Sequence, residues 1–377
     1  MPKSTRLLTL TLAALTAAAL PVAQLQPAHA EQPPSPPGLE WLCEGGGPIP
    51  AAELVNRVVS PACSLVGRMV TGPADTRGLN VRVPEPGELV RAFAVKPGGS
   101  EVLTVSNLDG EIRTEFDDTA DGADTADTAD TAHPDDTAHG ARGTEARHDA
   151  VAGPCEQSAY AFNHGGRGFP SLRWYYNSGS AARAGLSVAG AREAIVRANR
   201  TMTDVRDDCG LPRPDGRARS EYLGDTRASA NIDSGAGCTS GFPDGDNTVS
   251  WGPFDSGLNY LALTCTMSSS ATEQIYEADI YLASNRNLTL DLPKKGCSRL
   301  WDVEAVATHE WGHAFGLGHV DEETNGDLTM SPAITSCDTS ARTLGLGDHR
   351  GLDALYGAPS QPGSRPGLLD WVGDILG

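Results

Sequence analysis

One stretch of eleven residues decides the fold and the chemistry: His309-Glu310-Trp311-Gly312-His313-Ala314-Phe315-Gly316-Leu317-Gly318-His319. Residues four apart lie on the same face of an α-helix, so His309 and His313 can hold one metal ion from a single helix. Glu310 follows the first ligand directly, and its carboxylate can reach a water on that metal. Gly316 is expected to end the helix, because glycine readily takes the left-handed conformation, and His319 can then return as a third ligand.

Three neutral imidazoles suit zinc and leave a fourth position open, which is the catalytic rather than the structural arrangement. The shorter H-E-x-x-H pattern also occurs by chance on ordinary amphipathic helices. The extension through His319 argues against chance, and so does a candidate methionine turn around Met330, eleven residues beyond it. The sequence therefore predicts one catalytic zinc held by His309, His313 and His319, with Glu310 as the general base.

The long zinc motif followed by a methionine turn defines the metzincins. Residues 301–357 resemble the active-site half of a matrixin, the metzincin subgroup that contains the matrix metalloproteases. The entry to the zinc helix at 301–308 and the closing segment at 344–357, which ends in Leu-Tyr-Gly, carry this resemblance. Astacins and serralysins have a tyrosine two residues after the turn methionine, whereas this chain has Pro332. The resemblance is therefore to the matrixin side.

The closing segment departs from the family pattern at one position. Matrixins carry two adjacent acids there, and here Gly347 takes the place of the first and Asp348 remains. By resemblance, Asp348 is expected to anchor either the amino terminus of the domain or the active-site helix. Met330 is expected to form an apolar floor beneath the imidazoles, and residues 331–338 are expected to line one wall of the specificity pocket.

The resemblance implies an α+β metzincin catalytic domain at residues 151–358, with a twisted, mostly parallel five-stranded sheet, an active-site helix and a C-terminal helix. Apolar spacing predicts a helix over 187–205. The expected strands are 171–177, 228–232, 248–251, 261–266 and 275–282. An edge strand of this sheet is expected to receive an extended peptide by strand addition.

The amino-terminal 30 residues have the pattern of a secretory signal peptide. Lys3 and Arg6 precede an apolar run from Leu7 to Leu20, and Ala28-His29-Ala30 offers a cleavage site. A membrane anchor is the alternative, but the run is shorter than the roughly 20 residues that span a bilayer. The mature chain is therefore expected to be secreted, with no stable membrane association.

Three further segments flank the catalytic domain. Residues 31–116 are expected to be a propeptide or a small accessory domain, with a hairpin around Asp109-Gly110. Residues 117–150 repeat Asp-Thr-Ala and form an expected disordered acidic linker, in which Arg142 and Arg147 are accessible to a protease. Residues 359–377 are a tail with a short amphipathic helix.

Charge and composition limit the classes of molecule that the chain is expected to bind. The net charge is −20, with 49 acidic against 29 basic residues, which excludes nucleic acid because phosphate binding needs a basic face. The expected partner is a protein or peptide substrate, and the chain is expected to be a monomer. Asp244-Gly245-Asp246 is the candidate for a structural calcium site. A second structural zinc is not expected, because residues 209–298 contain no histidine.

Eight cysteines in an exported chain indicate disulfides. Two lie before the linker, which suggests Cys43 with Cys63, and six lie after it, with 15 connectivities open. Sequential pairing is the prediction for those six. Cys209 superficially echoes the cysteine switch of matrixin propeptides, in which a thiolate occupies the open zinc position. It follows the first catalytic helix instead of preceding the domain, so a disulfide is favoured.

The sequence as a whole predicts a secreted zinc endopeptidase of matrixin type. Two other functions remain open. The first is a catalytically silent protein-binding module that keeps the fold and the metal, although the presence of Glu310 favours an enzyme. The second is a purely structural zinc site, which requires a fourth protein ligand for which the sequence offers no good candidate.

Overall fold

The computed structural model describes residues 42–43, 47–54, 64–72, 78–108, 111–119, 153–163, 171–239 and 241–357. The expected signal peptide at 1–30, most of the expected linker and the tail at 359–377 lie outside the described residues. So does Cys63, and the predicted pairing of Cys43 with Cys63 stays a prediction. Within the described part of the chain, no helix is long and apolar enough to cross a bilayer.

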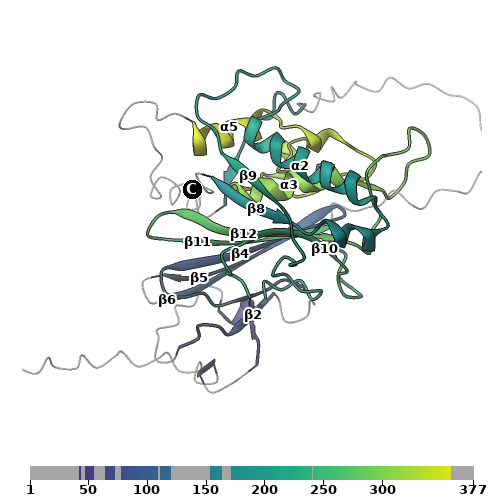
Figure 1. Ribbon diagram of the computed structural model, residues 1–377. Coiled ribbons are helices and arrows are strands. Elements are labelled where there is room, and N and C mark those ends of the chain that lie inside the picture. The colour runs from purple at the N-terminus through teal and green to yellow at the C-terminus, as the bar shows by residue number, and fades with distance from the viewer. Residues whose placement is uncertain are drawn as a thin grey trace, which may run out of the picture. The chain divides into compact units, whose positions relative to one another are not determined.

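A mixed sheet of eight strands forms the centre of the fold (Figure 1). Four neighbouring strands are parallel, and the remaining strands pair in antiparallel fashion. In spatial order the strands are β6 (Glu111–Thr119), β5 (Gly99–Leu108), β4 (Glu88–Lys96), β11 (Ala262–Ser269), β12 (Gln274–Ala283), β10 (Asn247–Gly252), β8 (Leu172–Tyr176) and β9 (Ser220–Asp225).

The central strands are buried on both faces, because other layers cover the sheet on each side. All six residues of β10 are buried, and so are the last seven residues of β12. Figure 1 shows the helices α2 (Val188–Asp204), α3 (Val303–Ala314) and α5 (Leu346–Tyr356) on one side of the sheet. A small sheet of β1 (Ile49–Pro50), β2 (Met69–Thr71) and β3 (Asn80–Arg82) lies on the other side.

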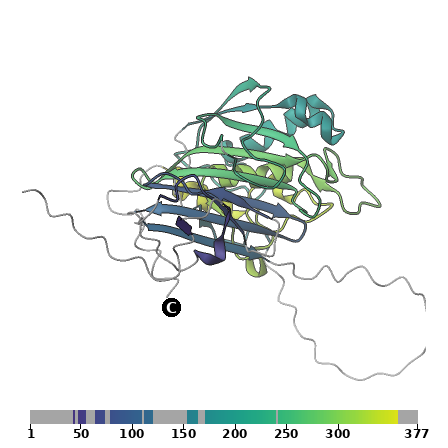
Figure 2. The same cartoon turned by 90° about the horizontal axis from the view of Figure 1, so that it is seen from below.

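Figure 2 shows the strands β4 to β6 continuing the large sheet beyond β11. The structure also contains several shorter elements. They are the strand pairs β7 (Ala161–Phe162) with β15 (Leu317–Gly318) and β13 (Leu288–Thr289) with β14 (Trp301–Asp302), the helix α4 (Glu322–Asn325), and the 3-10 helices η1 (Ala51–Glu53), η2 (Ser178–Ala184) and η3 (Ser340–Arg342).

The two long helices begin at side-chain caps. The Ser187 hydroxyl accepts the Gly190 N–H at 3.2 Å at the start of α2, and the Asp302 carboxylate accepts the Ala305 N–H at 2.9 Å at the start of α3. Each cap satisfies a backbone donor that has no partner within its helix. Asp302 is fully buried, and the Arg342 guanidinium pairs with its carboxylate. All twelve residues of α3 are buried, so the helix is held from every side.

The six cysteines after the linker pair sequentially, as predicted. The structure contains Cys155–Cys209, Cys238–Cys265 and Cys297–Cys337. The cysteine that echoes the matrixin switch is therefore a structural cysteine. Cys238–Cys265 ties a surface loop to β11, and Cys297–Cys337 ties the approach to α3 to the chain beyond the methionine turn.

Three sequence-based expectations need correction. The sheet has eight strands instead of five and is mixed instead of mostly parallel, because β4 to β6 from the expected propeptide region join it at β11 by antiparallel pairing. The segment 228–232 is not a strand, because its N–H groups bond side chains: Ala230 donates to Ser250 and Asn231 to Asp279. The neighbour of β8 is instead β9. Finally, the expected linker begins too early, because β6 extends to Thr119. The predicted hairpin is confirmed by the antiparallel pairing of β5 with β6.

Candidate metal centre

Three histidines converge at the end of α3. The Nε2 atom of His309 lies 3.1 Å from that of His313 and 3.2 Å from that of His319. His309 and His313 share one face of the helix, as their spacing predicted. Gly316 follows the helix with φ of 98° and donates its N–H to the His313 carbonyl at 3.0 Å. This left-handed residue turns the chain, and the short strand β15 then leads to His319.

The second ring nitrogen of His309 and that of His313 each have a fixed partner. His309 Nδ1 donates to the Thr329 carbonyl at 2.8 Å, and His313 Nδ1 donates to the Leu317 carbonyl at 3.0 Å. Because a carbonyl only accepts, these contacts place the proton on Nδ1 and the lone pair on Nε2. Burial lowers the pKa of His309 to about 4 and that of His313 well below its usual value. The buried pair is therefore neutral, which is the form that binds a metal.

The donor set fits zinc. With the protons of His309 and His313 on Nδ1, their Nε2 atoms both carry lone pairs and cannot hydrogen-bond each other, whereas a metal ion would accept both. Zinc–nitrogen bonds of about 2.0–2.1 Å place the nitrogens of a tetrahedral site about 3.3–3.4 Å apart, close to the observed separations. Among the described residues, this histidine group is the cluster with metal-ligand geometry. Carbonyl acceptors behind metal-bound histidines are the usual means of orienting their rings.

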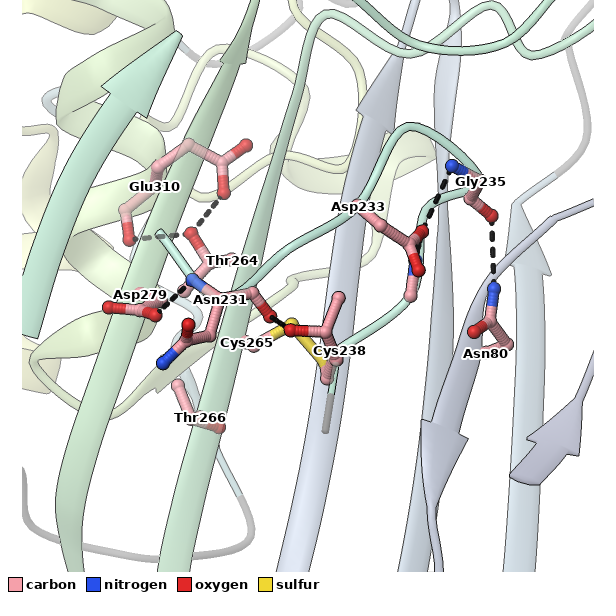
Figure 3. Close-up of a disulfide and its surroundings, with 12 residues drawn as sticks. Asn80, Asn231, Asp233, Gly235, Cys238, Thr264, Cys265, Thr266, Asp279 and Glu310 are labelled. Atoms are coloured by element: carbon pink, nitrogen blue, oxygen red, sulfur yellow. Dashed lines mark hydrogen bonds between the residues drawn. A yellow bond between two sulfur atoms is a disulfide. The ribbon is translucent and has the colours of Figure 1, made fainter. Parts of the chain in front are cut away.

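Glu310 lies on the sheet side of α3. Its carboxylate Oε2 accepts a hydrogen bond from the Thr264 hydroxyl on β11, as Figure 3 shows. The other oxygen, Oε1, is buried and has no hydrogen-bond partner among the described residues. Burial raises the pKa of Glu310 to about 8, while the Thr264 hydroxyl opposes that rise. A buried carboxylate oxygen without a partner is costly and calls for a structural or chemical explanation.

The methionine turn packs against the helix that carries His309 and His313. Met330 is buried, and its sulfur packs so closely against Gly312 that an added Cβ would lie 2.2 Å from it. The Asp348 carboxylate accepts the N–H groups of Thr329 at 2.9 Å and Met330 at 3.1 Å. Because the Thr329 carbonyl orients His309, Asp348 acts on a ligand through the turn. The sequence had suggested Asp348 as an anchor of the amino terminus or of the active-site helix.

Gly347 has a steric reason to lack a side chain. An added Cβ would lie 1.9 Å from the Ala159 carbonyl oxygen, because the chain at 157–159 packs directly on the first turn of α5. The Gly347 N–H donates to the Gln157 carbonyl at 2.9 Å. The close approach of these two backbones therefore leaves no room for a side chain at the position of the family's first acid.

The expected pocket wall borders a cavity of about 40 Å³. Its lining comes from Ala305 on α3 and from residues between Gly326 and Ala341. The candidate calcium loop is engaged in protein contacts: Asp244 accepts the Asn231 amide at 2.7 Å, and the N–H groups of Asp244 and Gly245 donate to Glu277. Calcium there stays a prediction.

Sequence reasoning missed several residues at the centre. Thr264 sits in a strand that was expected, but nothing in its sequence context indicates the bond to Glu310. Phe93 and Ser100 come from the amino-terminal region, more than 200 positions before the ligands they contact. Pairing over such a distance leaves no local pattern in a single sequence.

The α+β fold and the three-histidine centre at a buried helix are those expected of a metzincin. A model of the family Matrixin matches residues 236–357. Metalloendoproteinase 5-MMP of Arabidopsis thaliana is 31% identical over 105 residues, which are 28% of this chain and 27% of that protein. The chain thus spans about a quarter of the length of this curated relative. It carries a matrixin-like metalloprotease domain, which confirms the resemblance drawn from the zinc motif.

Proposed function

We propose that the matrixin-like domain is a zinc-dependent endopeptidase that acts on extended protein or peptide substrates. The observation that carries this proposal is the convergence of three Nε2 atoms next to a buried glutamate with one unpartnered oxygen. His309, His313 and His319 would hold the zinc. When bound, zinc lowers the pKa of a coordinated water from 15.7 to about 7 and polarises a carbonyl oxygen.

Glu310 is the proposed general base and acid. Its Oε2 is engaged by Thr264, which leaves Oε1 to take the proton of the attacking water and to pass it to the departing amine. Loss of a positioned general base typically costs about 100-fold to 10,000-fold in rate.

We further propose that the protein is secreted. The support is the expected signal peptide together with three disulfides, which persist in oxidising compartments. Sequencing the amino terminus of the exported protein tests this proposal. The expected sequence begins after Ala30 or further along the chain, and a cell-retained protein that begins at Met1 would contradict it.

The metal assignment is tested by zinc content in the full chain. The expected result is one zinc per parent chain and none in His313→Ala. His349→Ala is the matched control, because His349 is also buried but bonds the Pro212 carbonyl away from the cluster, at 3.1 Å. Hydrolysis of casein is then measured with the Phe93→Ala protein, which lacks the ring that stacks on the His313 ligand. Hydrolysis that survives chelation of the zinc would contradict the proposal.

A further inference from the structure

The edge of the catalytic sheet is already occupied by a strand of the same chain. Within residues 153–357, β11 is the last strand of the sheet and would offer its free edge to an extended peptide. Instead β4 pairs with it in antiparallel register over eight positions, from Ala262 with Val95 to Ser269 with Glu88. The Leu261 N–H also donates to the Val95 carbonyl at 2.8 Å.

The same segment reaches the opposite wall of the site. Pro97, immediately after β4, forms a parallel bridge with Ile334, one of the residues that line the small cavity beside α3. β4 therefore lies between β11 and β5, and Pro97 at its end reaches the 331–338 segment. A peptide substrate that adds to β11 would need this same space.

Side chains of the segment also cover the metal ligands. Phe93, opposite Thr264 in the register, stacks on the His313 ring with centroids 4.0 Å apart and planes at 11°. It also meets the His319 ring edge-on at 5.9 Å. The Ser100 hydroxyl on β5 lies 3.1 Å from His319 Nδ1. A phenyl ring cannot ligate a metal, so this cover acts by excluding water and peptide.

Polar contacts link β4 to the catalytic domain. Arg91 on β4 is buried, lies over the Phe93 ring at 5.2 Å, and donates to the Asn163 side chain at 3.4 Å. The Asn163 amide in turn reaches the Thr266 hydroxyl at 3.1 Å and the His313 carbonyl at 3.4 Å. These contacts tie β4 to the helix that carries the ligands.

A second attachment lies at the loop that the Cys238–Cys265 disulfide joins to β11. The Asn80 amide donates to the Gly235 carbonyl at 3.0 Å (Figure 3). The Asn80 N–H donates to the Ala236 carbonyl at 3.1 Å, and its carbonyl accepts the Cys238 N–H at 2.9 Å. The amino-terminal segment thus forms hydrogen bonds with β11 and with the loop that the disulfide joins to β11.

We propose that residues 80–119 are an internal inhibitor, which keeps the peptidase latent by filling the substrate edge of β11 and stacking Phe93 on His313. This inference rests on the proposed peptidase function and describes its regulation. All the contacts involve residues before 120 and after 152. A cut between these positions therefore leaves the inhibitor docked, and activation requires its release as well as the cut.

The experiment uses the full chain with a specific protease site inserted between residues 120 and 150. Parent, Phe93→Ala and Arg113→Ala proteins are compared before and after the cut. Arg113 is the matched control, because it lies on β6 with its side chain 65% exposed and paired with neighbouring Glu111. Each protein is assayed for casein hydrolysis and for hydrogen exchange of the β11 amides.

The parent and Arg113→Ala proteins are expected to stay latent after the cut, with protected β11 amides. Phe93→Ala is expected to hydrolyse casein about 100-fold or more faster than the cut parent, because truncation of a buried phenylalanine weakens the docking of the inhibitor by at least that factor. The β11 amides of this variant are expected to lose their protection from exchange. Casein hydrolysis by the uncut parent at the rate of Phe93→Ala would overturn the inference. So would unprotected β11 amides in the parent.

Hydrogen exchange separates this inference from the proposed function. If Phe93→Ala loses β11 protection but no protein hydrolyses casein despite bound zinc, the strand occupancy stands and the peptidase assignment fails. If the parent hydrolyses casein freely with β4 in place, the peptidase assignment stands and the inhibitor fails.

Discussion

Asp348→Ala tests how the fold holds the metal centre. The Asp348 carboxylate is buried and accepts three backbone N–H groups: Gly345 at 2.9 Å, Thr329 at 2.9 Å and Met330 at 3.1 Å. The alanine side chain accepts none of them. A buried donor left without a partner costs about 1–3 kcal/mol, and partial relaxation of the turn reduces the sum. The expected loss in the free energy of unfolding is about 3–5 kcal/mol.

The same substitution is expected to weaken zinc binding. The methionine turn positions the Thr329 carbonyl, and that carbonyl orients the His309 ring. Loss of an outer partner of a metal ligand typically lowers metal affinity by about 10-fold to 100-fold. The control is Asp353→Ala, an exposed aspartate of the same helix, for which the expected change in stability is within about 0.5 kcal/mol.

The assay is urea unfolding of both variants and the parent, followed by tryptophan fluorescence, with zinc affinity measured by competition with a chelator. Buried Trp174, Trp251 and Trp311 report on the catalytic domain. If Asp348→Ala unfolds at the same urea concentration as Asp353→Ala and binds zinc as the parent does, the link from α5 through the methionine turn to His309 is wrong.

Two further substitutions test the surroundings of the centre. Thr264→Val removes the hydroxyl that bonds the Glu310 carboxylate. We therefore expect the zinc content to be unchanged and kcat for casein hydrolysis, measured with the inhibitor released, to fall about 10-fold. An unchanged kcat would show that Thr264 does not position Glu310. Gly347→Asp restores the first of the family's two acids but drives a Cβ into the Ala159 carbonyl, so we expect a loss of about 1–3 kcal/mol by urea unfolding. Gly153→Ala, which meets nothing within 4 Å, is the control, and equal stability of the two variants would contradict the steric argument.

The local part of the site was predictable from sequence because helical geometry fixes it. The four-residue spacing of His309 and His313 and the glycine at 316 determine how the ligands meet, and the structure brings them together as expected. The role of Asp348 at the turn was not predictable, because it depends on a contact across about 20 residues whose geometry the sequence does not specify.

The sheet shows where sequence reasoning ends. β8, β10, β11 and β12 were expected, since their apolar residues mark buried strands. The addition of β4 was not, because pairing Phe93 with Thr264 joins positions about 170 residues apart. Both strands show ordinary strand patterns, and the choice of neighbour depends on the whole fold. The segment 228–232 was wrongly expected to be a strand, because its Ala230 and Asn231 N–H groups bond side chains instead of a neighbouring strand.

The assignment of a zinc peptidase with Glu310 as its base is tested most directly by comparing casein hydrolysis by the parent and by Glu310→Gln. Both proteins are measured at equal zinc content and with the inhibitor released. The substitution keeps the size of the side chain but removes the group that accepts the proton. We predict one zinc in each protein and a rate about 100-fold to 10,000-fold lower in Glu310→Gln. Equal rates in the two proteins, or no hydrolysis by a zinc-loaded parent, would contradict the assignment of a zinc peptidase with Glu310 as its base.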